Sequence, residues 1–479
     1  MRIRALITLI ATAALLTGVF AASASAAAVP GTNTFNHVNP QVSSAGQIDP
    51  NYGLFKCQVG LDRLGRTCYD PYQIRHAYGV DKLISKGYDG TGKTIVILDA
   101  YSDPYLLNDL AVFDSHYGLP APNFTVINPG GPPPAFNQGW AEEETLDVEW
   151  SHAIAPGANI ILDEAQSNSD ADLQAAAQYA VSNHLGDVLS QSFGENDTCL
   201  DPATRAAWHN TYAQAISEGM TVFASSGDQG ASQGTCDGNS WTQVTSSPAS
   251  DPLVTAVGGT ELHAAGYCLT SLGCNPSSAP APGTYQGDIA WNEGPTGDFS
   301  NLLGSTESSG GGYSTVWSEP SYQNGTGGLH GNKTGRAVPD VSYNAAIFHG
   351  VLVSLFQGTP LGGFYLFGGT SCGSPQWAAI TAILDQAAGH DYGFINSALY
   401  KIGQSANAAS FNDVTSGNNS WLEYDSNNNS VQGTGYNAGT GWDAVTGLGT
   451  PNVPGLMANL AKVWSAGQGN AAINNSKHG

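Results

Sequence analysis

The chain has 479 residues, with 15 lysines and arginines against 39 aspartates and glutamates, for a formal net charge of −24. Such an acidic protein repels polyanions, which excludes nucleic acid and anionic membrane surfaces as binding partners. Charged residues make up only 11% of the chain, below the roughly one quarter that is usual for soluble domains. A surface with few ion pairs loses few of them when carboxylates protonate, so the composition predicts tolerance of acid.

The first residues have the pattern of a secretory signal peptide. Arg2 and Arg4 precede an apolar run from Ala5 to Ala22, and Ala24-Ser25-Ala26 fits a signal-peptidase site. No later segment has the apolar length that a bilayer requires, so we expect a secreted, extracellular monomer that does not contact the membrane after signal removal. The expected organisation is a signal peptide over 1–26, an extended N-terminal segment over 27–68, one large domain over 69–464 and a polar, disordered tail over 465–479.

Seven cysteines favour an oxidising compartment. Their spacing suggests small loops closed by three pairs, although other pairings of six cysteines are possible: Cys57 with Cys68, Cys199 with Cys236, and Cys268 with Cys274. The remaining cysteine, Cys372, is expected to pack as a small buried group.

From Asp70 onward the pattern becomes α/β. Short apolar runs of the kind buried in parallel sheets occupy 94–99, 159–162, 187–192, 220–225 and 253–257. Helical patterns lie between them over 142–153, 170–183 and 202–218. The alternation predicts right-handed βαβ units and a sheet covered on both faces. Residues 265–312 are rich in Gly, Ser and Pro, and are predicted to form long surface loops.

The segment Phe367-Gly368-Gly369-Thr370-Ser371-Cys372-Gly373-Ser374-Pro375 precedes a helical, alanine-rich pattern from Gln376 to Ala388. This placement puts the Ser371 hydroxyl at a helix N-terminus, where free backbone N–H groups favour developing negative charge. A helix-capping serine is the simpler interpretation of this motif alone. A nucleophilic serine also needs a base and an oxyanion donor elsewhere in the chain.

Two acidic segments could supply those groups. Glu143 and Asp147 are four residues apart in a helical pattern and share one face, although an acidic helix start is more often a solvated face. Asp228 follows an apolar strand on a glycine-flanked turn, at the end of the strand where open parallel sheets carry their sites. An ordinary Asp-Gly turn is the alternative interpretation.

Taken together, these segments resemble the sedolisins, serine-carboxyl peptidases with a subtilisin-like fold, and in particular their kumamolisin-type members. Gly369-Thr370-Ser371 followed by Pro375 resembles the nucleophile motif, Glu143-x-x-Leu-Asp147 the paired carboxylates, and Ser226-Gly227-Asp228-x-Gly230 the oxyanion aspartate. The resemblance runs from about residue 69 to 463 and includes 69–78, 247–249, 256–260, 309–312 and 338–341.

The resemblance implies an α/β, subtilisin-like three-layer fold with a mostly parallel central sheet, helices on both faces and a C-terminal calcium-binding loop region. It also implies a serine-type endopeptidase that hydrolyses protein or peptide substrates. Ser371 would be the nucleophile and Glu143 its base, assisted by Asp147. A protonated Asp228 would donate to the oxyanion. Because Asp228 must be protonated while Glu143 is ionised, we expect an acidic pH optimum.

The resemblance implies two further sites. Substrate would bind as an added strand along Ser192, Phe193 and Gly194. One structural Ca²⁺ would be held by oxygen ligands, as a hard cation requires, from Asp413, Val414, Gly439, Gly441 and Asp443.

Three alternatives remain open from the sequence. A subtilisin-type triad would use Asp99, His152 and Ser371, but neither His152 nor His330 lies in the sequence context of a subtilisin histidine. The chain could instead be a catalytically silent, secreted binding module on the same scaffold, or a tripeptidyl-peptidase. Sedolisins usually carry a long propeptide, whereas only about forty residues separate the expected signal peptide from the domain here, so the route to folding and activation stays open.

Overall fold

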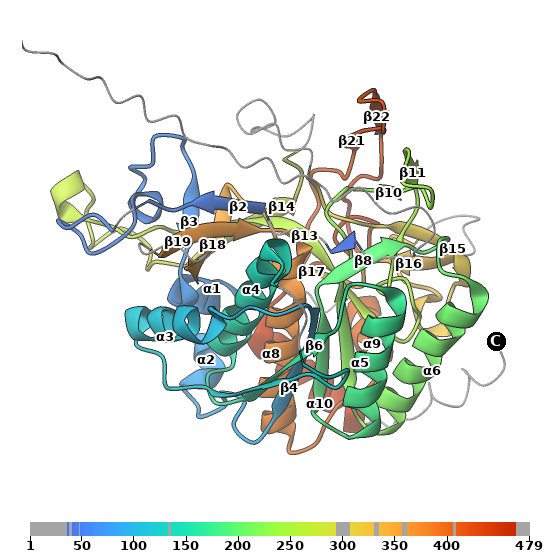
Figure 1. Cartoon of the computed structure of the whole chain (residues 1–479). Coiled ribbons are helices and arrows are strands. Elements are labelled where there is room, and N and C mark those ends of the chain that lie inside the picture. Colours follow the sequence, from blue (N-terminus) through green and yellow to red (C-terminus); the bar gives the residue numbers. More distant parts are fainter. Residues whose placement is uncertain are drawn as a thin grey trace, which may run out of the picture.

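The structure is a computed structural model that describes residues 36–37, 41–46, 48–132, 136–293, 307–329, 335–356, 362–405 and 409–465 (Figure 1). The expected signal peptide over 1–26 and nearly all of the expected tail over 465–479 lie outside these residues, as does His330. Within the described part, no helix has the length and apolarity needed to cross a membrane.

An eight-stranded sheet forms the centre of the molecule. Its parallel strands run, in spatial order, β5 (Asn123–Ile127), β6 (Asn159–Ala165), β4 (Thr94–Ala100), β7 (Val188–Gln191), β9 (Thr221–Ser225) and β13 (Thr255–Ala264). Strand β17 (Val341–Asn344) pairs with β13 in parallel, and β14 (Tyr285–Ala290) pairs with it antiparallel.

Helices cover both faces of this sheet. Successive β4 side chains point to opposite faces, and both sets are apolar and need to be buried. Val96 and Leu98 pack into a core with α5 (Asp170–Ser182) and α6 (Pro202–Ser217). Ile95 and Ile97 pack into a second core with α4 (Gln138–Ile154) and α8 (Gly373–Ala388). The expected three-layer α/β architecture is therefore confirmed. The other α-helices of the described residues are α1 (Pro71–Tyr78), α2 (Asp81–Ile84), α3 (Leu106–Tyr117), α9 (Asn396–Gln404) and α10 (Val453–Ser465).

A second, four-stranded sheet lies beside the central one and includes the N-terminal segment (Figure 1). Its order is β2 (Gln41–Ser44), β19 (Gly363–Gly368), β18 (His349–Leu355) and β3 (Thr67–Tyr69). A three-stranded sheet joins β1 (Asn36–His37), β8 (Phe193–Asn196) and β12 (Ser246–Ser247). Four short pairs complete the described strands: β10 (Ser232–Gly234) with β11 (Trp241–Gln243), β15 (Gly312–Ser318) with β16 (Gly335–Val338), β20 (Phe411–Asn412) with β23 (Thr450–Pro451), and β21 (Trp421–Tyr424) with β22 (Ser430–Gly433).

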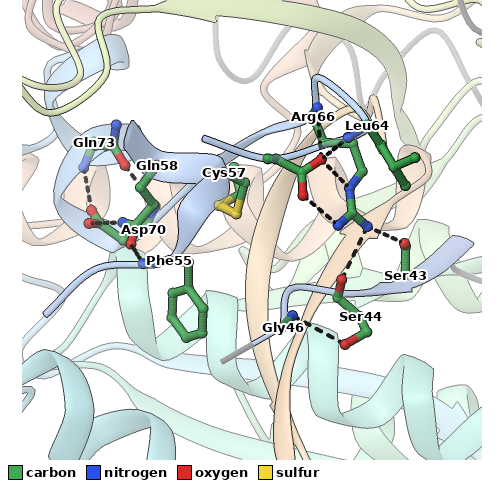
Figure 2. Close-up of a disulfide and its surroundings, with 12 residues drawn as sticks. Ser43, Ser44, Gly46, Phe55, Cys57, Gln58, Leu64, Arg66, Asp70 and Gln73 are labelled. Carbon is green, nitrogen blue, oxygen red and sulfur yellow. Dashed lines mark hydrogen bonds and ion pairs between the residues drawn. A yellow bond between two sulfur atoms is a disulfide. The ribbon is translucent and has the colours of Figure 1, made fainter. Parts of the chain in front are cut away.

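The Cys57–Cys68 disulfide closes a loop at the end of the N-terminal segment, where β3 begins (Figure 2). Beside it, the Arg66 guanidinium donates to Asp62, to the Ser43 hydroxyl at 2.6 Å and to the Ser44 carbonyl at 3.1 Å. Asp70, the N-cap of α1, accepts from Gln58 at 2.8 Å and from the Gln73 amide at 2.9 Å. This disulfide and the other two expected ones, Cys199–Cys236 and Cys268–Cys274, are formed, and Cys372 is free and buried.

The five predicted strands and four predicted helices are present. Most boundaries shift by a few residues, and β13 continues to Ala264, beyond its predicted end at residue 257. The prediction of surface loops throughout 265–312 is wrong, because this region contains the sheet strand β14 and the buried residues Ser308 and Ser309. Strand β14 escaped recognition because it lies at the edge of the sheet, where most of its residues are only half-buried and no continuous apolar run is needed.

Candidate active site

Ser371 lies in a single 3-10 turn, Thr370–Cys372, that connects β19 directly to α8. The side chain is fully buried, and its hydroxyl has no hydrogen-bond partner among the described residues. Gly369 enters this turn with φ 106°, a conformation that glycine adopts readily. A Cβ atom at Gly369 would come within 2.6 Å of the Asp228 Oδ2 atom. Glycine at this position therefore lets the nucleophile turn approach Asp228 closely.

Asp228 sits just after β9, on the turn that the sequence predicted. Its Oδ1 atom accepts hydrogen bonds from the Thr370 amide at 2.8 Å and the Thr370 hydroxyl at 2.7 Å. Its Oδ2 atom is buried and has no partner among the described residues. Burial raises the pKa of Asp228 to about 7, although both Thr370 bonds act to lower it. A protonated Asp228 thus has one oxygen held as an acceptor and one free to carry the donating proton.

Glu143 and Asp147 project from α4, which is buried along most of its length between the sheet, α8 and β18. Both side chains are completely buried, so the expectation that this acidic helix face is solvated is wrong. Asp147 accepts a hydrogen bond from the Ser192 hydroxyl at 2.7 Å. Asp99, at the end of β4, is also fully buried and interacts electrostatically with Asp147 and Glu143.

Burial is the main reason that the pKa values of Glu143, Asp147 and Asp99 all lie well above their usual range. Mutual repulsion among these carboxylates raises the pKa of Glu143 further, whereas the nearby Ser371 hydroxyl acts to lower it. Groups that interact this strongly exchange protons as one unit. The cluster therefore holds protons at pH values where isolated carboxyl groups have lost them.

The structure brings all four predicted catalytic residues close together. Ser371, Asp147 and Asp228 are each near enough to the Glu143 carboxyl group to shift its pKa. The expected hydrogen bond between Glu143 and Ser371 is not formed with ordinary geometry. Neither Glu143 oxygen nor the Ser371 hydroxyl has a hydrogen-bond partner in the described part of the chain. Such bonds are often long or misaligned before substrate binds.

From the sequence, Asp99 was a candidate only in the alternative subtilisin-type triad, and Glu144 had no predicted role. The structure buries Glu144 next to Asp99, Glu164 and Asp103, so the carboxyl cluster is larger than the predicted pair. The position of Asp99 at the carboxyl end of a buried parallel strand is the signal that could have identified it.

The comparisons with known proteins agree with this geometry. A sequence model of the subtilase family matches residues 139–398. Kumamolisin from Bacillus sp. (strain MN-32) is 32% identical over 80% of this chain and 62% of its own length. The solved structure of Pseudomonas sedolisin, a serine-carboxyl proteinase bound to two molecules of pseudo-iodotyrostatin, is 30% identical with a TM-score of 0.68, and the match covers 83% of this chain and 99% of that one.

The chain belongs to the sedolisin family. Tripeptidyl-peptidase 1 from Canis lupus familiaris is also similar, at 30% identity over 67% of this chain and 52% of its own length. The chain spans about half to three fifths of the length of these curated relatives.

The predicted substrate-binding residues lie at and just before β8. Ser192 contacts Asp147, while Phe193 and Gly194 belong to the strand itself. The N-terminal strand β1 pairs antiparallel with this strand, with Asn36 opposite Gly194 and His37 opposite Phe193. After β1 the chain reaches β2, where Gln41 pairs with Gly368, three residues before Ser371. The N-terminal segment of this sedolisin thus pairs with β8, which follows Ser192, and with β19, which leads into the nucleophile turn.

The residues predicted to bind calcium also come together in the structure. The exposed Asp413 accepts hydrogen bonds from the Gly441 amide at 3.1 and 3.2 Å, and Asp443 accepts from the Gly439 amide at 3.0 Å. Asp443 is mostly buried, which raises its pKa to about 6, and no Lys, Arg or His pairs with it among the described residues. Val414, whose carbonyl is the remaining predicted ligand, is adjacent to Asp413 and buried. Two carboxylates and nearby carbonyls without a protein counter-charge are a suitable donor set for a hard divalent cation.

His152 does not form a subtilisin-type triad. Its Nε2 atom lies 2.8 Å from the Pro120 carbonyl and 3.4 Å from Asp114, a residue of α3. Burial lowers the pKa of His152 to about 4, which favours a neutral ring that donates to Pro120. The histidine has a packing role in this site, while carboxyl groups surround Ser371.

Proposed function

We propose that this sedolisin is a secreted serine-type endopeptidase that hydrolyses peptide bonds in proteins at acidic pH. The observation that carries the proposal is that the buried Ser371 hydroxyl lies among three buried carboxyl groups, those of Glu143, Asp147 and Asp228. Oxygen atoms of Ser371, Glu143 and Asp228 have no hydrogen-bond partner among the described residues. Unsatisfied polar groups in a protein interior are costly, and they are retained where a ligand or reaction uses them.

In the proposed acylation step, the Ser371 Oγ atom attacks the scissile carbonyl carbon and Glu143 accepts the hydroxyl proton. Asp147 accepts a hydrogen bond from Ser192 and lies close to Glu143. When Asp147 is ionised, its charge raises the pKa of Glu143 and makes Glu143 a stronger base. Glu143 then returns the proton to the leaving amine, and water hydrolyses the acyl-enzyme by the reverse sequence. The carboxyl pair takes the place that a histidine occupies in other serine peptidases.

Asp228 supplies the oxyanion donor in this mechanism. Its Oδ1 atom is occupied by Thr370, so the proton resides on Oδ2, which faces the nucleophile turn through Gly369. A carboxyl group donates only when it is protonated, so this stabilisation disappears as the pH rises through about 7. The alkaline limb of activity therefore reports on Asp228, and the acidic limb reports on ionisation of the Glu143 cluster.

Substrate is proposed to bind as a strand along Ser192, Phe193 and Gly194, with the backbone pairing that β1 makes in the structure. A structural Ca²⁺ is proposed at Asp413, Asp443 and the carbonyls of Val414, Gly439 and Gly441. When bound, it supplies positive charge to the buried Asp443 and stabilises the C-terminal loops.

The test is digestion of a denatured protein between pH 2 and pH 8 by the wild type and the Ser371→Ala variant, both in excess Ca²⁺. We expect cleavage with an acidic optimum and a loss of about 10⁴-fold or more in the variant, since removal of a nucleophile removes the covalent route. Equal stability of the two proteins in thermal melts is the folding control. Cleavage that survives in Ser371→Ala would reject the mechanism, and cleavage by neither protein would favour a binding module.

Tripeptidyl-peptidase activity is a second candidate, favoured by the similarity to tripeptidyl-peptidase 1. Matched peptides with free and acetylated N-termini separate the two activities. An endopeptidase cleaves both peptides at internal positions, whereas a tripeptidyl-peptidase releases three residues from the free peptide only.

A further inference from the structure

Away from the Ser371 site, three possible metal ligands converge from two sheets. Glu261 and His263 are two residues apart on β13 and so point to the same face, and His349 begins β18. One Glu261 carboxylate oxygen lies 3.3 Å from His263 Nε2 and 3.1 Å from His349 Nε2. The three ligand atoms all lie within 4.8 Å of one another. Neither the proposed peptidase mechanism nor the calcium loop uses these residues.

These separations suit a small cation. Zinc bonds of roughly 2.0–2.2 Å to nitrogen and carboxylate oxygen place tetrahedral ligands about 3.4 Å apart. Two histidines and one glutamate also match the ligand types that zinc prefers when a fourth position is left to water. His263 is 42% exposed, whereas the side chains of His349 and Glu261 are 15% and 11% exposed. The cluster is therefore preorganised on one side and open to solvent on the other.

The hydrogen bonds around His349 are compatible with a metal-binding form of its ring. The Tyr69 hydroxyl donates its one proton to the Leu262 carbonyl at 2.8 Å, so at 3.5 Å from His349 Nδ1 it can only accept. A ring with its proton on Nδ1 presents the Nε2 lone pair toward Glu261, which is the form that binds a metal. Without a metal, a proton on Nε2 makes the 3.1 Å contact with the Glu261 oxygen a hydrogen bond, and a metal ion would replace that proton. Second-shell hydrogen bonds of this kind fix histidine tautomers in metal sites.

The surrounding charge also favours a cation. Asp288, whose carboxyl is held by Thr260 and Thr450, interacts electrostatically with His263. The carboxyl group of Glu293 repels that of Glu261. No lysine or arginine forms an ion pair with Glu261 in the part of the chain that the structure describes.

We propose that Glu261, His263 and His349 form a binding site for one divalent transition-metal ion of the zinc type, separate from the catalytic and calcium sites. The metal would join β13 of the central sheet to β18 of the sheet that holds the N-terminal segment. Binding of an ion to the folded state alone raises the melting temperature.

The test is titration of the full chain with Zn²⁺ at neutral pH in excess Ca²⁺, which keeps the proposed calcium loop filled. We expect one Zn²⁺ per chain, a higher melting temperature, and visible d–d absorption of a low-coordinate complex when Co²⁺ replaces Zn²⁺. His263→Gln and His349→Gln should each weaken binding by about 10-fold or more and abolish that absorption. His184→Gln is the matched control, because His184 is 68% exposed and contacts Glu218 instead.

The proposal is overturned if the wild type binds no Zn²⁺, or if binding and the Co²⁺ spectrum persist in both site variants. It is also overturned if the His184→Gln control loses binding equally. Should His349→Gln fail to fold, His263→Gln decides the question, because its half-exposed side chain can be replaced with little effect on packing.

Discussion

Two fully buried acidic sites in this protein, Asp340 and the cluster of Asp99, Glu143 and Asp147, differ in how their charge is balanced. Asp340 lies against Arg336, with 2.5 and 2.9 Å between the guanidinium and the carboxylate. It also accepts from the Tyr400 hydroxyl and the Ala256 amide, each at 2.8 Å. Asp99, Glu143 and Asp147 are equally buried but have no basic partner among the described residues, and most of their oxygens are unpartnered. Full pairing fixes the structure, whereas unpaired carboxyls keep protons available for chemistry.

The largest expected effect on stability comes from breaking the paired group. Asp340→Asn leaves the buried Arg336 guanidinium without its counter-charge, and we expect a loss of about 3–5 kcal/mol in the free energy of unfolding. Urea denaturation measures this loss. Asp147→Asn is the matched variant at the unpaired group and should cost less than about 1 kcal/mol, because its neutral form is already favoured. Equal losses in the two variants would remove the distinction between the groups.

Asp228 allows a test of proton donation itself. Asp228→Ala should lower kcat/KM by about 10²–10³-fold, as expected for loss of one oxyanion donor. Asp228→Asn can still accept from Thr370 with its oxygen and donate with its amide nitrogen, so it should retain more activity. The loss of rate that the wild type shows near pH 7 should be absent in this variant, because an amide does not ionise there. A pH profile of Asp228→Asn with the same alkaline limb as the wild type would contradict the assignment.

The smallest expected effect is on how the melting temperature depends on pH. Asp99 has a pKa well above its usual range, so the folded state binds a proton that the unfolded state has released at neutral pH. Its contribution to stability is complete below the unfolded pKa and is lost as the pH rises toward the folded value. Asp99→Asn removes this dependence, so it should melt about 2–4 °C above the wild type at pH 8.

At pH 4 the Asp99→Asn variant and the wild type should melt together. Wild-type protein should itself melt higher at pH 4 than at pH 8, since burial raises the pKa of Asp228 to about 7 and of Asp163 to about 8. A wild type that is more stable at pH 8 would show that these carboxyls do not control the pH response.

The sequence predicted the central strands, because β4, β6 and β9 each contain a short apolar run. It also identified the four catalytic candidates through family motifs. It did not predict that α4 is buried, because the covering elements α8 and β18 come from distant parts of the chain. The contact of Asp99 with Asp147 depends on the packing of α4 against β4, which no local pattern encodes. Glu261, His263 and His349 were missed for the same reason.

The pairing of β1 with β8 would affect how rate depends on substrate concentration if the proposed substrate strand is correct. A segment tethered in the same molecule acts as a ligand at an effective concentration on the order of millimolar, which dilution does not change. If substrate uses the same strand, the apparent KM contains the opening equilibrium of β1 as a factor, whatever the intrinsic affinity of the strand for peptide. The protein would then prefer peptides that compete well against the backbone of its own Asn36 and His37.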